Sequence, residues 1–193
     1  MPKTKLFNED DVLSKALDIF WKKGYYATSM QDLVNHLGIS RSSLYSIFEC
    51  KRTLFDKALE QYCSINKNDT REFLQNQKNV KAGLSRLFEI AISESISDID
   101  RKGCFVVNTT TELISRDRKI QDVLAENRSD FEEIFHEFLL SGKKSGEISK
   151  EKNLDVIASL IYTFYSGIKV VAKIEPDRKK LNSSVSILLS LLN

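Results

Sequence analysis

The chain has 193 residues, of which 41% are hydrophobic and 29% charged, with only seven glycines and two prolines. This composition is typical of a helix-rich globular protein, one ordinary domain or two small ones, that buries a core without disulfides or metals. The net charge of +2 excludes a polycation, so any binding to nucleic acid must depend on where the charges are placed.

Cysteine usage and the N-terminal residues favour a cytoplasmic location. Cys50, Cys63 and Cys104 are far apart in the sequence and lack Cys-x-x-Cys spacing, which is typical of a reducing compartment. Residues 1–5 are polar and do not resemble a signal peptide. The most apolar stretch, Val156–Ile168, is expected to be too short to cross a bilayer and to form a buried helix.

Helical periodicity begins near the N-terminus. A first helix is expected between Asn8, a suitable N-cap followed by three acidic residues, and Gly24, a suitable stop. The residues that share its apolar face are Val12, Ala16, Ile19 and Phe20.

Two short helices are expected next. Thr28 and Gln31 have the spacing of a capping box, which predicts that the second helix begins at Thr28. Gly38 stands where a left-handed turn residue is needed, and Ser40 is placed to cap a third helix. The inward-facing residues of the third helix are expected to be Ile39, Leu44 and Phe48.

The remaining sequence also predicts helices. A fourth helix is expected to start near Lys51, and the polar segment 65–78 is either its tail or a hinge. Further helical patterns lie at 79–97, 104–115, 119–142, 153–174 and 178–192. No alternating strand pattern is evident, so the predicted fold class is all-α: an N-terminal three-helix helix-turn-helix domain and a C-terminal helical bundle.

The segment from residue 28 to 51 indicates DNA binding. Two short helices joined by a glycine-containing turn can present the second helix to the major groove. Because Leu44 and Phe48 take its inward face, the outward face of the third helix carries side chains suited to bases and phosphates. These are Arg41, Ser42, Ser43, Tyr45 and Ser46.

Helix starts in this segment offer further contacts. Lys51 and Arg52 occupy the first turn of the fourth helix, where cations oppose the helix dipole unless an anion sits above the helix end. A DNA phosphate would be such an anion, and Thr28 and Ser29 offer a similar helix start. The alternative is that Lys51 and Arg52 are simply solvated.

The region from Ala16 to Leu59 resembles the DNA-binding domain of the TetR family of bacterial transcriptional regulators. The resemblance rests on many positions at fixed spacing: Phe20, Gly24, Tyr25, Thr28, Gly38, Ile39, Ser40, Leu44, Tyr45, Phe48 and Lys51. It covers about the first third of the chain, and the rest matches the family only in length and helical character. Cys50 departs from the pattern, because a capping Ser or Asn is usual at this position.

The resemblance implies that Tyr45 and Lys51 contact phosphates and that Arg41, Ser42, Ser43 and Ser46 lie near the groove. It also implies a homodimer on a near-palindromic operator, which agrees with two recognition helices reading half-sites one DNA turn apart. The implied division is a DNA-binding domain over 1–50 and a regulatory and dimerisation domain over 51–193.

The last two predicted helices are the candidates for self-association. Two apolar stripes could form a four-helix interface across a two-fold axis, although either stripe could belong to the core of the chain instead. The residues expected in the dimer interface are Ile157, Ile161, Tyr165, Ile168, Val185, Leu188 and Leu192.

The 104–115 segment is apolar but is interrupted by polar residues, and buried polar groups need partners. A small-molecule effector could be one partner, as the resemblance suggests; the alternative is that these groups bond within the protein. The residues expected to bind an effector are Phe88, Ile92, Phe105, Asn108, Thr109, Glu112, Phe131, Phe135 and Tyr162.

No catalytic or metal-binding pattern stands out, so an enzyme and a cofactor are not expected. Cys50 could be a redox-sensitive thiol, because a helix start and neighbouring cations lower a thiol pKa, or it could be an incidental small residue. The sequence therefore predicts a DNA-binding transcriptional regulator, a repressor that an effector releases from its operator. The alternative is a helical adaptor that binds DNA or protein without a ligand response.

Overall fold

The computed structural model describes residues 8–193, and every regular element in that range is helical, as expected for an all-α protein. The elements in chain order are α1 (Glu9–Lys23), α2 (Met30–Leu37), α3 (Arg41–Phe48), α4 (Lys51–Gln75), α5 (Val80–Ser97), α6 (Phe105–Leu113), the short 3-10 helix η1 (Ile114–Arg116), α7 (Arg118–Ser145), α8 (Leu154–Ile174) and α9 (Arg178–Ser190). The polar segment 65–78 therefore belongs mostly to the tail of α4.

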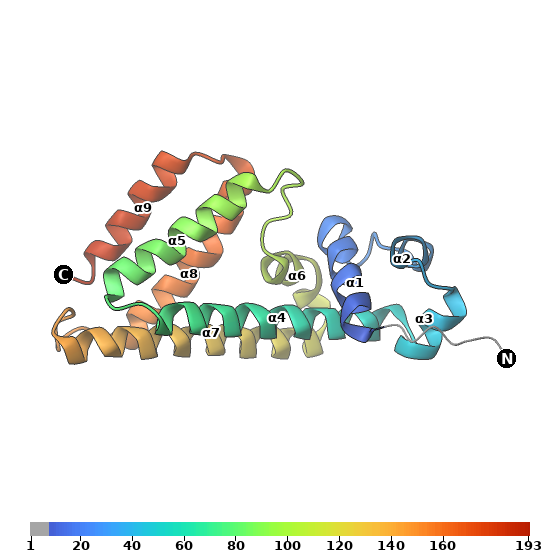
Figure 1. Ribbon diagram of the computed structural model, residues 1–193, viewed down its shortest axis with the longest axis horizontal. Coiled ribbons are helices and arrows are strands. Elements are labelled where there is room, and N and C mark those ends of the chain that lie inside the picture. The colour runs from blue at the N-terminus through green and yellow to red at the C-terminus, as the bar shows by residue number, and fades with distance from the viewer. Residues whose placement is uncertain (1–7) are drawn as a thin grey trace.

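The molecule is elongated, with two helical groups joined by long helices (Figure 1). α1, α2 and α3 form one end, and α5, α8 and α9 form the other. α4 and α7 pack along each other and run between the two ends. α6 lies between the two end groups and packs against both α4 and α7. A signal from the far group can therefore reach the N-terminal group through α4, α6 or α7, or through the 98–104 loop, which contacts α1.

Local capping signals explain most helix boundaries. Asn8 caps α1 by accepting the Asp10 N–H, and Gly24 ends α1 with φ +84°, as the sequence predicts. Gly38 has φ +66°, a left-handed conformation that favours glycine, and it separates α2 from α3. Ser40 caps α3 by accepting the Ser43 N–H, which also confirms the prediction.

Two apolar cores hold the chain together, and the first is not confined to the three N-terminal helices. It joins Phe20 and Phe48 to Phe55 of α4, Phe105 of α6 and Ile120 of α7. The N-terminal unit is thus packed against the start of α4 and against α6. A functional boundary at residue 50 stays a prediction.

The second core fills the space between α5, α7, α8 and α9. Three residues expected to bind an effector lie inside it and are fully buried: Phe88, Ile92 and Phe135. None of the three lines the aromatic cavity described below, whereas Phe131 of the same core does. A role for Phe88, Ile92 and Phe135 in effector binding stays a prediction.

The expected dimer residues are mostly part of the same core. Ile161, Ile168, Val185, Leu188 and Leu192 are each at most 7% exposed, so the stripe chosen from the sequence faces inward. Ile157 and Tyr165 are partly buried and pack against this core. The prediction selected the wrong side of α8 and α9, because both sides of α8 are apolar and periodicity alone does not tell them apart.

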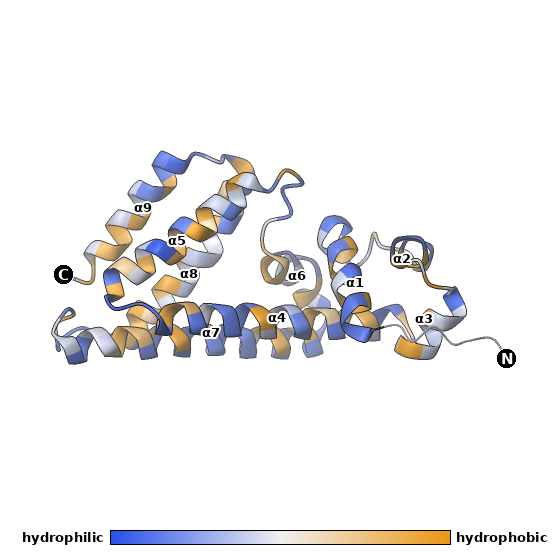
Figure 2. Cartoon of the chain, viewed as in Figure 1, coloured by the Kyte–Doolittle hydropathy of each residue, from blue (hydrophilic) through white to orange (hydrophobic). Residues whose placement is uncertain are grey.

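The outer side of α8 and α9 is also apolar. Figure 2 shows hydrophobic residues distributed along both helices. Several of them are exposed, namely Val156, Leu160, Val170, Val171, Ile174, Ile187 and Leu191. α8 is longer than the expected apolar stretch, and within residues 8–193 it is the one helix with the length and composition to cross a membrane. Its inward side packs in the second core, as in the core helix of a soluble protein.

Candidate DNA-binding surface and effector cavity

α3 is fixed to the N-terminal unit by its apolar side. Leu44 and Phe48 are each 1% exposed and belong to the first core. Ile39, in the turn before α3, is buried in the same core. Because these side chains hold α3 from beneath, its opposite side is rigidly presented to solvent, as the sequence predicts.

The outward side of α3 carries the residues expected to lie near DNA. Arg41, Ser42, Tyr45 and Ser46 are exposed, whereas Ser43 is partly buried. The hydroxyls of Ser42 and Ser43 are 2.9 and 2.8 Å from the hydroxyl of Ser40, so both are already engaged in the cap of α3. The apolar side chain of Ile47 is also exposed on this helix.

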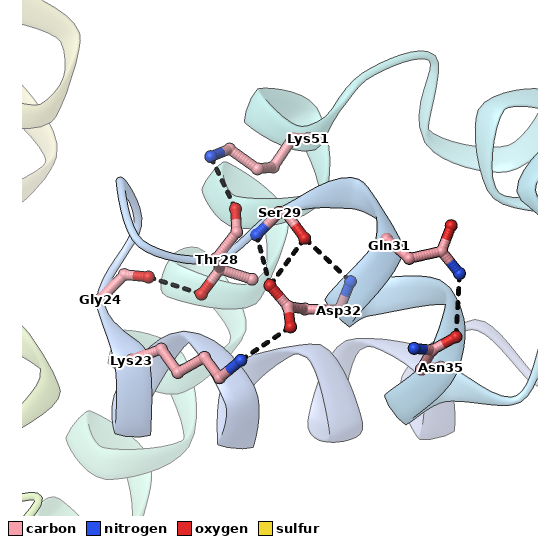
Figure 3. A network of polar contacts seen from close by, with 8 residues as sticks. All are labelled: Lys23, Gly24, Thr28, Ser29, Gln31, Asp32, Asn35 and Lys51. Atoms are coloured by element: carbon pink, nitrogen blue, oxygen red, sulfur yellow. Dashed lines mark hydrogen bonds and ion pairs between the residues drawn. The ribbon is translucent and has the colours of Figure 1, made fainter.

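The start of α2 differs from the expected capping box. Ser29 is the N-cap, and its hydroxyl accepts the Asp32 N–H while the Asp32 carboxylate accepts the Ser29 N–H at 2.9 Å (Figure 3). Lys23 also contacts Asp32 at 2.7 Å, and these contacts hold the pKa of the Asp32 carboxyl well below its usual range. The box therefore uses positions 29 and 32, one residue later than the predicted pair.

Thr28 is buried and does not face solvent. Its hydroxyl donates to the Gly24 carbonyl at 2.6 Å, which closes the turn between α1 and α2 (Figure 3). A DNA contact through the Thr28 side chain is therefore wrong. The threonine of this motif shapes the turn, and the neighbouring exposed Ser29 remains the candidate contact at the start of α2.

Lys51 has a structural role that sequence reasoning missed. Its ammonium donates to the carbonyls of Tyr25 and Thr28, both at 2.9 Å, and lies 4.3 Å from the centre of the Tyr25 ring. Burial lowers the pKa of Lys51. The start of α4 is thus tied to the turn before α2.

The Arg52 side chain is paired with carboxylates of the same chain. Its guanidinium contacts Asp56 one turn along α4 and also Asp117, the N-cap of α7. Lys119 completes this group by contacting Asp56 at 2.9 Å. The anions that balance the cation at this helix start therefore belong to the chain, which corrects the interpretation of Arg52.

Glu112 connects α6 to the N-terminal unit. Its carboxylate accepts the backbone N–H groups of Tyr25 and Tyr26, at 3.0 and 2.8 Å. A Cβ at Gly24 would lie 2.9 Å from the same carboxylate, so a larger residue would displace the Glu112 side chain in addition to straining the backbone at a positive φ. Glu112 therefore holds the turn between α1 and α2, and we name this contact the Glu112 bracket.

The polar residues Asn108 and Thr109 of α6 differ in whether they are bonded within the chain. The Asn108 amide donates to the Lys102 carbonyl at 2.7 Å and lies near Lys173. Thr109 is 2% exposed, and its hydroxyl has no hydrogen-bond partner among the described residues. These two residues, with Phe105 and Glu112, border a cavity of about 280 Å³ between the end of α1 and α6. They line the boundary between the two halves of the molecule and do not reach the rest of the expected effector set.

A second, aromatic cavity lies deeper in the regulatory half. Of the residues expected to bind an effector, Phe131 and Tyr162 line it. Sequence reasoning missed the others, which are Tyr62, Asn66, Cys104, Val106, Asn127, Tyr165, Ser166 and Lys169. The cavity has a volume of about 30 Å³, room for one or two water molecules. A polar cavity of about 380 Å³ adjoins it and shares Tyr62, Asn66 and Lys169.

Neither a metal site nor a reactive constellation accompanies these surfaces. No group of three His, Cys, Asp or Glu side chains with metal-binding geometry occurs in the described part of the chain. Cys50 is exposed, and a hydrogen bond from the Thr53 hydroxyl lowers the pKa of its thiol. The lowered pKa has the expected direction. Its largest cause is the Thr53 hydroxyl, the backbone N–H groups of Thr53 and Arg52 at the helix start add to it, and the charges of the neighbouring cations do not. Redox sensitivity at Cys50 stays a hypothesis.

Comparison with known protein families matches both halves of the chain. Residues 12–58 match the model described as bacterial regulatory proteins of the tetR family. Residues 81–188 match the tetracyclin repressor-like C-terminal domain. The first match contains α2 and α3, and the second contains most of the residues around the aromatic cavity.

Individual relatives agree along the full length. The HTH-type transcriptional regulator YezE of Bacillus subtilis is 31% identical, with both chains covered completely. The HTH-type transcriptional repressor ComR of Escherichia coli is 28% identical over 92% of this chain and 85% of its own length. The solved structure of the TetR family regulator CifR with 26-base-pair operator DNA is 26% identical, with a TM-score of 0.86 over 99% of this chain and 100% of that one.

The helix-turn-helix geometry, the two family matches and the full-length relatives lead to one conclusion: the chain belongs to the TetR family and is a DNA-binding transcriptional regulator that acts as a homodimer.

Proposed function

We propose that this protein is a repressor in the bacterial cytoplasm, which leaves a near-palindromic operator when a small-molecule effector binds its regulatory half, and that it acts by binding without catalysis. The observation that carries the proposal is the Glu112 bracket. It joins the turn before α2 to α6, and α6 begins beside the aromatic cavity at Cys104 and Val106. One short helix thus touches both the DNA-binding unit and the candidate effector site.

The DNA contacts are proposed for the exposed side of α3. Arg41 can bond a guanine or a phosphate, and Tyr45 can reach a phosphate or pack on a sugar. Ser46, and the engaged hydroxyls of Ser42 and Ser43, lie on the same exposed helix, and Ser29 marks the start of α2. Lys51 would contact a phosphate. Ile47 adds an apolar contact suited to a thymine methyl group.

The dimer interface is proposed for the outer side of α8 and α9, with a second copy of this chain as its occupant. Ile174 is 77% exposed, Ile187 72% and Val156 62%. Exposed apolar side chains gathered on two neighbouring helices indicate an interface. In a two-fold dimer the same patch of each protomer would be buried against its partner. Ile187→Glu should place a charge in this interface and produce a monomer in size-exclusion chromatography with light scattering.

The coupling between the two sites is proposed to run through α4 and α6. DNA favours one spacing of the recognition helices in the dimer, and the effector favours another. An effector weakens DNA binding only to the extent that its affinities for the two states differ, typically by about 1–3 kcal/mol. Tyr62 of α4 and Cys104 at the start of α6 both line the cavity, with the Tyr62 hydroxyl 4.0 Å from the Cys104 sulfur. A ligand in the cavity would therefore contact both helices.

The test is operator binding by matched variants. A footprint on the DNA upstream of the protein's own gene supplies the operator, and Tyr45→Ala should then lower the affinity by roughly tenfold while leaving the dimer intact. Lys51→Ala should lower it as well, with an added loss of stability from the two carbonyl contacts. Lys144→Ala, which removes an exposed lysine at the far end of α7, is the control.

The outcomes separate the alternatives. If Tyr45→Ala binds the operator as tightly as the wild type, the contacts proposed for α3 are wrong. If binding is insensitive to salt, the phosphate contacts are absent, because DNA binding through several phosphates falls steeply as salt rises. A helical adaptor without a ligand response would keep its operator affinity in the presence of every compound that binds the regulatory half.

A further inference from the structure

Lys169 is a largely buried cation without an acidic partner. It lies on α8 at the junction of the aromatic cavity and the adjoining polar cavity and lines both. No ion pair within 4 Å involves Lys169 among residues 8–193. Its ammonium lies 4.4 Å from the centre of the Tyr165 ring.

The contrast with the next lysine on the same face of α8 is informative. One turn further along, Lys173 donates to the Lys102 carbonyl at 3.2 Å and approaches the Asn108 amide oxygen at 3.4 Å. Lys173 is thus held by protein oxygens, whereas Lys169 points into the shared boundary of two cavities. Glu94 and Asp98 line the same polar cavity as Lys169, but neither forms an ion pair with it within 4 Å, so the position next to the ammonium is open to an anion from outside the chain.

Burial opposes the charged form of Lys169, whereas its neighbours Tyr165, Cys104 and Glu94 favour it, and the pKa of Lys169 is raised above its ordinary value. Tyr165 and Cys104 attract the ammonium only when they are ionised, so near neutral pH Glu94 is the one charged neighbour of these three. A charge taken out of water without a counter-ion is unfavourable, and buried charges in proteins are therefore paired. A bound anion at this position would supply the missing pairing.

The surroundings define the rest of the ligand. Aromatic rings of Phe131, Tyr162 and Tyr165 line the inner cavity, which suits a flat or compact apolar body. On the outer side, Glu94 and Asp98 line the polar cavity together with Lys102, whose ammonium is already paired with Asp18 at 3.4 Å, so the two carboxylates would repel a second negative charge. The site thus combines one unpaired cation, apolar walls and a rim that disfavours polyanions.

We propose that the effector is a small monoanionic organic acid, with its carboxylate on the Lys169 ammonium and its apolar body among the aromatic rings. This inference rests on the proposed function and specifies the ligand class. By the same reasoning, phosphate-rich ligands such as nucleotides are expected to bind more weakly, since they would place several negative charges beside Glu94 and Asp98.

The small volume of the inner cavity explains how such an acid would act. A body larger than one or two waters does not fit into about 30 Å³, so its entry must separate the walls. Those walls include Tyr62 on α4 and Val106 on α6, and α6 ends at the Glu112 bracket. Binding would therefore move α6 relative to α4 and, through Glu112, shift the N-terminal unit.

The experiment compares acids with their neutral amides. Benzoate and 3-phenylpropanoate are titrated against benzamide and 3-phenylpropanamide, using the intact dimer and isothermal calorimetry. The chain has a single tryptophan, Trp21, which borders the polar cavity and gives a fluorescence signal in parallel. The variants are Lys169→Met, which removes the charge but keeps an unbranched stem, and Lys169→Arg, which keeps the charge.

The proposal expects at least one acid to bind with Kd below about 1 mM and at least tenfold more tightly than its amide. Lys169→Met should abolish this preference, and Lys169→Arg should retain it. The proposal is overturned if acid and amide bind equally, if the preference survives in Lys169→Met, or if neither acid gives a heat or fluorescence change up to about 10 mM.

Operator binding measured without ligand separates this inference from the proposed function. If wild type and Lys169→Met both bind the operator and neither acid binds, only the ligand class is wrong. If the wild type fails to bind the operator found by footprinting, the proposed repressor function fails whatever the cavity binds.

Discussion

The helices α3 and α6 look alike in sequence but have opposite roles. Both are short, with eight and nine residues, and both place several hydroxyl or charged side chains among apolar ones. On α3 the polar side faces solvent and is free for a partner, apart from the serines of its cap. On α6 the polar groups Asn108 and Glu112 end on other parts of the same chain. The same pattern therefore indicates an external partner in one helix and an internal one in the other.

The difference depends on contacts that are remote in sequence. Glu112 is separated by 87 and 86 residues from the two amides it accepts. A buried polar group needs a partner, but the sequence does not say whether that partner is a ligand or a distant backbone group. The role of α3, in contrast, follows from neighbours within a few residues: a cap at Ser40, a glycine at position 38 and an apolar face.

The largest expected effect tests whether α3 is held only by its apolar side. Phe48→Ala removes a ring that is 1% exposed in the first core, and it should lower the free energy of unfolding by about 3–5 kcal/mol. Ile47→Ala, a neighbouring side chain that is 37% exposed, should change it by less than about 0.5 kcal/mol. Urea unfolding followed by circular dichroism measures both. Equal losses for the two variants would contradict the assignment of inner and outer faces.

The next effect tests whether the polar side of α6 is structural. Glu112→Ala leaves two backbone N–H groups without their acceptor and should destabilise the protein by about 1–3 kcal/mol. Ser46→Ala on α3 should lower operator affinity with a change in stability of less than about 0.5 kcal/mol. Thermal unfolding and a gel-shift assay distinguish the two variants. Full stability of Glu112→Ala would contradict the structural role assigned to the polar side of α6.

The Glu112→Ala variant also sharpens the coupling proposal. Any compound that binds the aromatic cavity should still bind this variant, because Glu112 does not line that cavity. Its effect on operator affinity should shrink, since the bracket that joins α6 to the N-terminal unit is gone. An unchanged response of operator affinity to the same ligand would show that α4 alone carries the signal.

The smallest effect concerns the ion pair between Arg52 and Asp117. Arg52 holds the pKa of the Asp117 carboxyl below its ordinary value. A carboxyl with a lowered folded-state pKa contributes stability above its unfolded pKa of about 3.9, and this contribution disappears as the pH falls through the folded pKa. Asp117→Asn keeps an oxygen that can cap α7 but removes the charge, so it should be less stable at pH 7 by less than about 1 kcal/mol.

The pH dependence is the decisive measurement for Asp117→Asn. The difference in unfolding free energy from the wild type should be largest at pH 7 and should narrow when the pH is lowered below about 4. Asp69→Asn, at an exposed position of α4, serves as the matched control. A difference that stays constant down to about pH 3 would mean that the amide introduced by the substitution is simply a poorer cap than the carboxyl group.

Much of the fold could be predicted from local signals, and the site only in part. Asn8, Gly38 and Ser40 act through hydrogen bonds or backbone angles within a few residues, so the pattern alone reveals them. The capping box was misplaced by one residue because Thr28 and Ser29 are equally good caps, and burial of Thr28 decides between them. Lys169 was missed because one lysine in an apolar helix carries no local sign of facing a cavity.

The predicted dimer interface was misplaced for a related reason. α8 is apolar on two sides, and only the packing of α5 and α7 against one of them shows which side remains exposed. Ile168 and Ile174 are chemically the same but are 3% and 77% exposed. Periodicity identifies a helix with an apolar face, whereas the three-dimensional arrangement decides which neighbours cover it.

The two carbonyl contacts of Lys51 have a mechanical consequence. They connect the first turn of α4 to the backbone just before α2 by two hydrogen bonds, which restrict relative motion of these two segments. From Lys51 to Tyr62 the helix extends about 16 Å, at 1.5 Å per residue. A tilt of this arm at the cavity end would therefore swing the N-terminal helices as one rigid body, and repression would be lifted by a change of angle between intact parts and not by their local melting.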